Sequence, residues 1–336
     1  MPNDTQAKYH HLIPQTYMSA WANGSGTLRT EKIDSPGVFE ERNKEKIGGI
    51  TDFHTITAGS PLCTRSDADL IFSSVSNYRV TYDGKALQDT LEMNKVFWDF
   101  DNWIITRSDG TTVSKKRIRN DIEQVKIKDI EANWSSKYEN SWADQVQTIE
   151  EKVLKATTDT IAAFDKEYLM KFFVALDWRG FKSNDQFENV VSWLCTEVLP
   201  LDEVDIPEDE RLLRSLPTAA DEMRHNLLLQ YFRQYLDDRG IIYQVAQTNL
   251  NHTSFHFLVS DGPTLFITSD TPAFVYTRPD GRKMGMMPIT PRILLTQGRQ
   301  TVDTGEFYIT HITDTAVQNY NDIIRQNADS FVILNW

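Results

Sequence analysis

Residues 255–276, FHFLVSDGPTLFITSDTPAFVY, contain three apolar runs separated by polar turns. The runs Phe255–Val259, Thr264–Thr268 and Ala273–Tyr276 have the length and composition of β-strands, and Asp261-Gly262 supplies a turn between the first two. Parallel neighbours need a long crossover, so links this short favour antiparallel pairing. This stretch therefore predicts the centre of an antiparallel sheet.

The same pattern extends to both sides of that stretch. Further strands are predicted at Ile241–Gln247, Met284–Pro288, Ile293–Thr296, Phe307–Thr310 and Phe331–Leu334. A helix is predicted over Thr313–Ala328, because its apolar residues recur at helical spacing. Residues 241–336 are thus expected to form an antiparallel sheet with a C-terminal helix.

Residues 115–239 have a helical rather than a strand-like period. Apolar side chains recur every three or four residues from Ile118 to Val153, which predicts one helix of about 35 residues, broken near Trp134–Lys137. Further helices are predicted over Asp165–Arg179, with Asp165 as N-cap, from Ser183, where a capping box begins, and over Thr218–Arg239.

Residues 1–113 are irregular and turn-rich, with short β-like pieces. A run of helices followed by a run of strands indicates an α+β fold. We expect a helical layer, about 115–239, packed on the C-terminal antiparallel sheet, with an irregular β-containing N-terminal region. The 336 residues are expected to share one core as a single α+β body.

The composition excludes several classes of protein. With 35 Lys+Arg against 48 Asp+Glu the net charge is −13, which argues against broad non-specific binding to nucleic acid or to anionic membranes.

No apolar run is long enough to cross a bilayer and no signal peptide is visible, so we expect a cytoplasmic protein without a membrane partner. Two cysteines, Cys63 and Cys195, make neither a disulfide framework nor a zinc site. The common phosphate-loop, zinc-protease and serine-hydrolase motifs are absent.

The segment Tyr9–Gln15 carries the first candidate site residues. His10 and His11 are adjacent and are followed by Gln15. Histidine titrates near neutral pH, which suits proton transfer or metal binding. On a strand the two rings would point to opposite faces, so at most one would belong to a given site. The alternative is an incidental pair in a loose surface segment at the chain end.

Three more candidates lie next to apolar segments. Asp270 follows a predicted strand and could be a catalytic base or metal ligand, or could simply cap the backbone before Pro272. Arg179 ends an apolar helix and could hold an anionic substrate or pair with a buried acid. Asn321 lies within a helix, where Asn is unfavourable, and is expected to have a specific partner.

These motifs resemble a known family. His10–Met18 resembles the H-H-[YL]-[VI]-P-Q-x-Y-L start of the bacterial domain-of-unknown-function family 4238, and Phe266–Pro272 resembles its F-[IL]-T-S-D-x-P motif. Looser similarities lie at Phe53–Thr55, Phe172–Gly180, Pro288 and Pro291, and Asn321 with Ala328. The resemblance implies an intracellular bacterial or phage-borne α+β protein with an insertion at 57–130, and it implies no known reaction.

Two functions of different kinds follow as hypotheses. The first is a hydrolase, in its narrower form a nuclease-like effector in phage defence that acts on nucleic acid or a nucleotide. In it His10 or His11 would act as acid/base, Asp270 as base or divalent-metal ligand, and Arg179 as the anion holder, with Gln15 and Asn321 orienting them. The alternative is a non-enzymatic sensor or interaction module. Its Trp-rich helix and acidic loop, Leu201–Glu210, would bind a protein partner.

Overall fold

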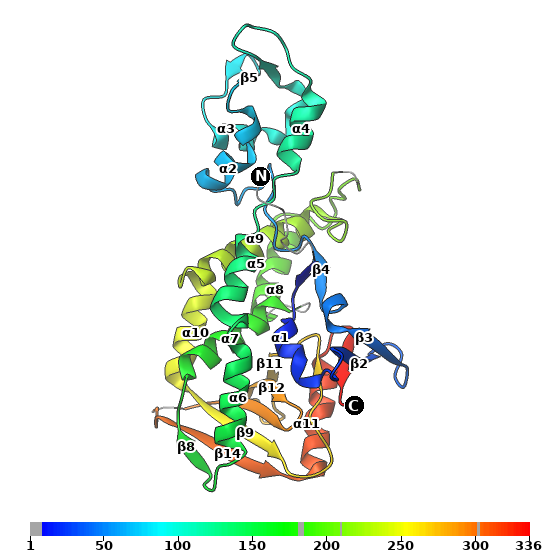
Figure 1. Ribbon diagram of the computed structural model, residues 1–336, viewed down its shortest axis with the longest axis vertical. Helices are drawn as coiled ribbons and strands as arrows, with labels where there is room; N and C mark the ends of the chain where they lie inside the picture. Colours follow the sequence, from blue (N-terminus) through cyan, green and yellow to red (C-terminus); the bar gives the residue numbers. More distant parts are fainter. Residues whose placement is uncertain (1–8, 181–184, 209, 301–302) are drawn as a thin grey trace. The chain divides into compact units, whose positions relative to one another are not determined.

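The computed structural model describes residues 9–180, 185–208, 210–300 and 303–336 (Figure 1). It confirms an α+β fold, with helices and several antiparallel or mixed sheets. The chain divides into two compact units. In the described part of the chain, none of the helices is both long and apolar enough to cross a membrane.

The first unit comprises the described residues within 52–132 and 201–233. Its 52–132 segment has nearly the limits of the insertion expected from the sequence. In chain order its elements are α2 (Arg65–Ile71), η3 (Ser73–Val75), β5 (Arg79–Tyr82), β6 (Lys85–Ala86), α3 (Thr90–Lys95), η4 (Phe97–Asn102), β7 (Ile104–Thr106), α4 (Lys115–Glu123), α5 (Asp129–Trp134) and α9 (Ala219–Leu236). Helices α5 and α9 continue past the limits of this unit.

A small aromatic core holds the first unit together. Phe72, Phe97, Phe100 and Trp103 are buried with ring centroids 4.9–6.2 Å apart. Strand β5 pairs with β6 on one side and with β7 on the other. Aromatic side chains bury large apolar areas, so four of them can stabilise a unit whose helices and strands are mostly short.

The second unit comprises the described residues within 9–51, 133–200 and 234–336. In chain order its first elements are β1 (Tyr9–His11), α1 (Gln15–Met18), η1 (Ser19–Trp21), β2 (Thr27–Lys32), β3 (Phe39–Asn43), η2 (Lys44–Lys46), β4 (Gly49–Thr51), the π-helix η5 (Ser135–Glu139), α6 (Trp142–Val153), β8 (Thr160–Ala162), α7 (Lys166–Arg179), α8 (Asp185–Trp193) and the π-helix η6 (Leu194–Val198). The remainder is α10 (Gly240–His252), β9 (Thr253–Ser260), β10 (Thr268–Ser269), β11 (Phe274–Thr277), β12 (Lys283–Thr290), β13 (Ile293–Arg299), β14 (Glu306–Ile312), α11 (Asp314–Asn327) and β15 (Phe331–Leu334).

The second unit is layered around a six-stranded sheet of order β11-β12-β13-β9-β14-β8. One face packs on α11, where Leu258, Met286 and Leu294 meet Val317 and Ile324. The opposite face lies against α7 and α10, which are neighbours (Figure 1). A second sheet of order β10-β15-β2-β3 joins the N-terminal and C-terminal parts of the chain.

Some predicted elements are wrong. Residues predicted as the strand Ile241–Gln247 form helix α10, because Gly240 adopts φ +81° and lets the chain reverse after α9 and start a second helix. The predicted helix of about 35 residues is divided into α4, α5, η5 and α6, with the π-helix at the expected break.

Three further details differ from the sequence expectations. Of the predicted strand Thr264–Thr268 only Thr268 is paired, in β10, and β14 pairs with β9 in parallel rather than antiparallel. Asp165 precedes α7 with φ +43° and makes no side-chain cap. The predicted capping box at Ser183 lies outside the described residues.

Candidate functional site

The candidate site in the first unit begins with a backbone turn at residues 52–55. Asp52 adopts φ +57° and its carbonyl accepts from the N–H of Thr55. An isolated bridge then pairs Ile56 with Ile127, with both N–H···O bonds at 3.0 Å. This bridge places the turn beside the start of α5, although the two segments are far apart in the sequence.

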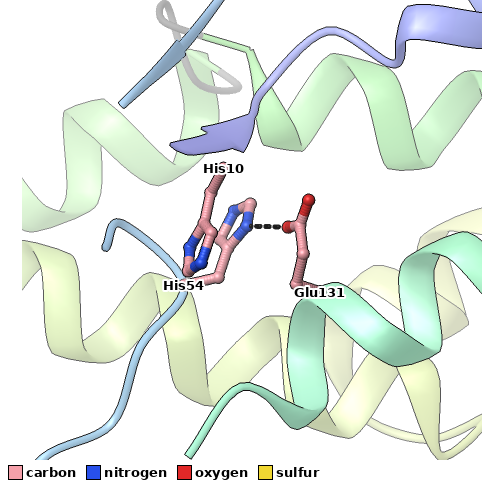
Figure 2. A group of neighbouring side chains, drawn as sticks. All are labelled: His10, His54 and Glu131. Atoms are coloured by element: carbon pink, nitrogen blue, oxygen red, sulfur yellow. Dashed lines mark hydrogen bonds and ion pairs between the residues drawn. The ribbon is translucent and has the colours of Figure 1, made fainter. Parts of the chain in front are cut away.

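The turn presents His54 to Glu131 of α5. Nδ1 of His54 donates to Oε2 of Glu131 at 2.7 Å, and the His54 side chain has no exposed surface while that of Glu131 is 20% exposed. Figure 2 shows this bond as a dashed line, and it also draws His10, which belongs to β1 in the second unit. Because the bond fixes the proton on Nδ1, the lone pair of His54 is on Nε2.

Helix α9 packs aromatic and imidazole rings against the turn. His225 lies 4.7 Å from the Phe53 ring, and Phe232 lies 5.7 Å from the His54 ring, centroid to centroid. His225 and Phe232 are seven residues apart and so share one face of the helix. Burial, reinforced by electrostatic repulsion between the two imidazoles when both His225 and His54 carry a proton, lowers the pKa of His225 to about 3, so its ring is neutral at physiological pH.

An arginine network fixes the helix that carries Glu131. Arg233 of α9 donates to Asp67 at 2.8 Å, to Asp129 at 3.0 Å and to the carbonyl of Leu62 at 3.0 Å. Asp129 is the first residue of α5, and Asp67 closes the capping box of α2. Burial by itself would raise the pKa of Asp67, but the bonds from Arg233 and Thr64 outweigh it, and the pKa is lowered.

A buried histidine oriented by a carboxylate has a defined chemical use. The carboxylate fixes the tautomer and the ring orientation, and it stabilises the imidazolium that forms when Nε2 takes up a proton. The same arrangement orients histidines that bind metals through Nε2. His311 and Asp261 make a matching bond of 2.7 Å, but their side chains are 46% and 60% exposed. The pair of His54 and Glu131 is therefore distinguished by its burial.

The structure places His10 and His11 on strand β1. This strand pairs with β4, with His10 opposite Ile50 and His11 opposite Gly49, and the two histidines are 0% and 9% exposed. Gly49 is required there, because a Cβ would lie 2.9 Å from the Tyr9 ring and closer still to the carbonyl of His10. The alternative of a loose surface segment is wrong, since the backbone pairs in a sheet and both side chains are buried.

Three predicted site residues lie together in the second unit. Arg179 is 2% exposed and donates to the carbonyl of His11 and to the carboxylate of Glu139, while its guanidinium lies 5.0 Å from the Trp134 ring centroid. Nε2 of Gln15 lies 3.2 Å from Nε2 of His11. Arg179 thus has an acidic partner, as in the alternative to an anion site, although the side chain of Glu139 is 15% exposed rather than buried. Glu139 ends the π-helix η5, a type of distortion that is frequent at functional sites.

Asp270 and Asn321 hold backbone instead. The Asp270 carboxylate is fully buried and accepts from the N–H groups of Asp329 at 2.9 Å, Ser330 at 2.6 Å and Phe331 at 3.1 Å. Burial raises the pKa of Asp270, and these three bonds oppose that effect. Asn321 donates to the carbonyl of Leu265 at 2.9 Å and accepts from Ile267 at 3.1 Å, which confirms that it has a specific partner.

A family model for a protein of unknown function, DUF4238, matches residues 9–335 of the chain. The chain belongs to this family. No curated protein and no solved structure matches the chain.

Within this DUF4238 chain, hydrogen bonds connect His11 with Gln15 and with Arg179. The hydrogen bonds of Asp270 and Asn321 go instead to backbone groups elsewhere in the chain. The sequence did not single out His54 and Glu131 as functional. They are 77 residues apart, and neither has a neighbour at catalytic or ligand spacing. The one available signal was the position of His54 within Phe53–Thr55, which resembled a family motif.

Proposed function

We propose that this protein is a hydrolase in which His54, oriented by Glu131, transfers protons during attack by water. The supporting observation is the 2.7 Å bond between the two side chains, with the ring of His54 buried. A positioned acid–base group accelerates a reaction by about 10²–10⁴-fold. The narrower form of the proposal is a nuclease-like effector in bacterial phage defence.

A divalent metal ion is the other use of the same pair. A histidine nitrogen and a carboxylate oxygen are ligands for such ions, and His54 and Glu131 each offer one. A bound metal would lower the pKa of its water and supply the hydroxide. Both uses require His54 and Glu131, and they differ in whether a chelator stops the reaction.

The test is hydrolysis by the purified protein. Substrates are carboxylic esters, bis-p-nitrophenyl phosphate, single- and double-stranded DNA, and RNA, each with Mn²⁺ and with EDTA. We expect turnover of at least one class, and a loss of at least about 10²-fold in His54→Ala and Glu131→Gln. His10→Ala, His11→Ala and Arg179→Met are assayed beside them, since these roles stay predictions.

His311→Ala is the matched control, because it removes a histidine with the same carboxylate geometry from an exposed position. We expect it to hydrolyse at the wild-type rate. The proposal is overturned if no substrate class is hydrolysed, or if folded His54→Ala and Glu131→Gln keep the wild-type rate.

The alternative, a non-enzymatic sensor or interaction module, has one favourable observation. Val190 and Trp193 of α8 are 63% and 59% exposed and lie three residues apart, on one side of the helix. The Trp-rich helix invoked from the sequence gives no such surface, since Trp134 and Trp142 are buried. If phage protection in cells survives His54→Ala but is lost in Val190→Ser/Trp193→Ser, the interaction module replaces the hydrolase.

A further inference from the structure

A cavity of about 650 Å³ lies in the second unit, between helices α7 and α10 and one face of the six-stranded sheet. This volume is within the usual range of small-molecule sites, about 300–1,000 Å³. Its lining comes from residues of the second unit, so it is separate from His54 and Glu131.

The floor of the cavity is a row of small and polar residues across the sheet. Val275 pairs with Gly285, and Gly285 with Gln297, so the three lie side by side on one face. Two residues further along, on the same face, are Lys283 on β12 and Arg299 on β13. A Cβ on Gly285 would lie 2.9 Å from the Phe173 ring, so glycine is what lets α7 approach the sheet here.

One wall is a polar stripe of α10. Gln244, Thr248, Asn249 and His252 line the cavity together with Ile241 and Val245, at the spacing of a single helical face. A helix that packs on a sheet usually turns an apolar stripe toward it. Amides and hydroxyls on that stripe instead indicate that this part of the sheet is not covered by the helix alone.

Two buried polar atoms in the lining have no hydrogen-bond partner within the described part of the chain. They are Nε2 of Gln297, in a residue 6% exposed, and Oγ1 of Thr271, in a residue 4% exposed. An unsatisfied buried polar group costs about 1–3 kcal/mol. A ligand that accepts from Gln297 and exchanges a hydrogen bond with Thr271 would remove that cost.

The cavity also carries positive charge in a protein whose net charge is −13. Among the described residues, neither Lys283 nor Arg299 has an ion pair or a side-chain hydrogen bond, whereas nearby Arg278 and Arg282 both pair with Asp280. Asp177 lines the cavity too, so its fixed charges are two positive and one negative. Unpaired Arg and Lys side chains are suited to phosphate.

We propose that this cavity binds a nucleoside monophosphate. Lys283 and Arg299 hold the phosphate. Gln297 and the amides of α10 hydrogen-bond the edge of the base, since amide side chains match the donor and acceptor pattern of a base. The apolar lining, which includes Phe173 and Phe274, contacts the flat ring.

Isothermal titration of the full chain with AMP, GMP, CMP and UMP tests this proposal. Inorganic phosphate and ribose 5-phosphate serve as comparison ligands. We expect at least one nucleotide to bind with a micromolar Kd and both comparison ligands to bind at least tenfold more weakly. Lys283→Ala/Arg299→Ala and Gln297→Leu should each weaken nucleotide binding at least tenfold.

Arg282→Ala is the control for the cation variant, because it removes an exposed arginine from beside Lys283 that already has an ion pair. It should bind like wild type, and so should His54→Ala, which separates this result from the hydrolase proposal. The proposal is overturned if no nucleotide binds at millimolar concentration, if phosphate alone binds as tightly, or if the folded cavity variants bind like wild type.

Discussion

Replacing Asp270 by Asn tests whether this residue holds the fold or acts in chemistry. Oδ2 accepts from both Ser330 and Phe331, and Oδ1 accepts from Asp329. The Asn amide has one accepting oxygen, so in its best orientation it keeps the two bonds from Ser330 and Phe331, and its buried –NH2 group faces the N–H of Asp329 without an acceptor. A buried donor without a partner costs about 1–3 kcal/mol, so Asp270→Asn should lower the free energy of unfolding by about that amount.

Asp270→Ala removes both acceptor oxygens and all three bonds, and it should cost more than Asp270→Asn. Urea unfolding followed by circular dichroism measures both, with Asp322→Asn as the matched control on the exposed face of α11. The control should stay within about 0.5 kcal/mol of wild type. The structural reasoning is refuted if Asp270→Asn unfolds at the wild-type urea concentration, and a loss of hydrolysis in that stable variant would restore the catalytic role.

Three further outcomes follow from buried charges. Arg179→Met should lower the free energy of unfolding by about 3–5 kcal/mol, because it leaves the Glu139 carboxylate without its buried partner. The double variant Arg179→Met/Glu139→Gln should regain part of that free energy, and urea unfolding measures both variants. The pKa of Asp67 is lowered in the fold, so the stabilising effect of its carboxylate is present above about pH 3.8 and is lost as pH falls through the folded pKa. In acid unfolding, Asp67→Asn should not show this decrease in stability, because Asn does not take up a proton. The pKa of His225 is lowered to about 3, so protonation favours the unfolded chain. The free energy of unfolding should therefore fall as pH drops from about 6.5 toward 3. In His225→Phe, urea unfolding at several pH values should show a smaller dependence of this free energy on pH over that interval.

The sequence predicted helices and strands well where apolar residues form a stripe or a bounded run. Helix α11 lies close to its predicted place because burial on one face imposes a helical period on its residues. Helix α7 and strands β12, β13 and β15 are buried on more than one side, and they were found because they are apolar runs bounded by turn or cap residues. The prediction of a strand at helix α10 is wrong because one face of this helix packs in the core and another lines the cavity. Its buried residues Ile242 and Ala246 pack inward on one face, while polar residues at helical spacing line the cavity on another. The segment therefore lacks the single apolar stripe that marks a helix in a sequence.

Long-range pairing was beyond the reach of local patterns. Strand β14 lies parallel to β9 although short links elsewhere favour antiparallel neighbours, because β13 and β14 run in opposite directions on the two sides of β9, and β13 is the antiparallel one. The meeting of His54 and Glu131 depends in the same way on the bridge between Ile56 and Ile127. A bridge of one residue pair leaves no periodic trace in the sequence.

The Ser269-Asp270 motif shows how a specific sequence can have a structural cause. Oγ of Ser269 accepts from the N–H of Thr271 and donates to its carbonyl, which makes a tight local turn. Asp270 then reaches the backbone of residues 329–331, so the motif joins the end of β10 to the start of β15, its partner strand. Both side chains of the motif are thus satisfied by backbone. If chemistry occurs in this protein, a buried histidine with a carboxylate on one nitrogen is better suited to move a proton than a carboxylate that three N–H groups already hold.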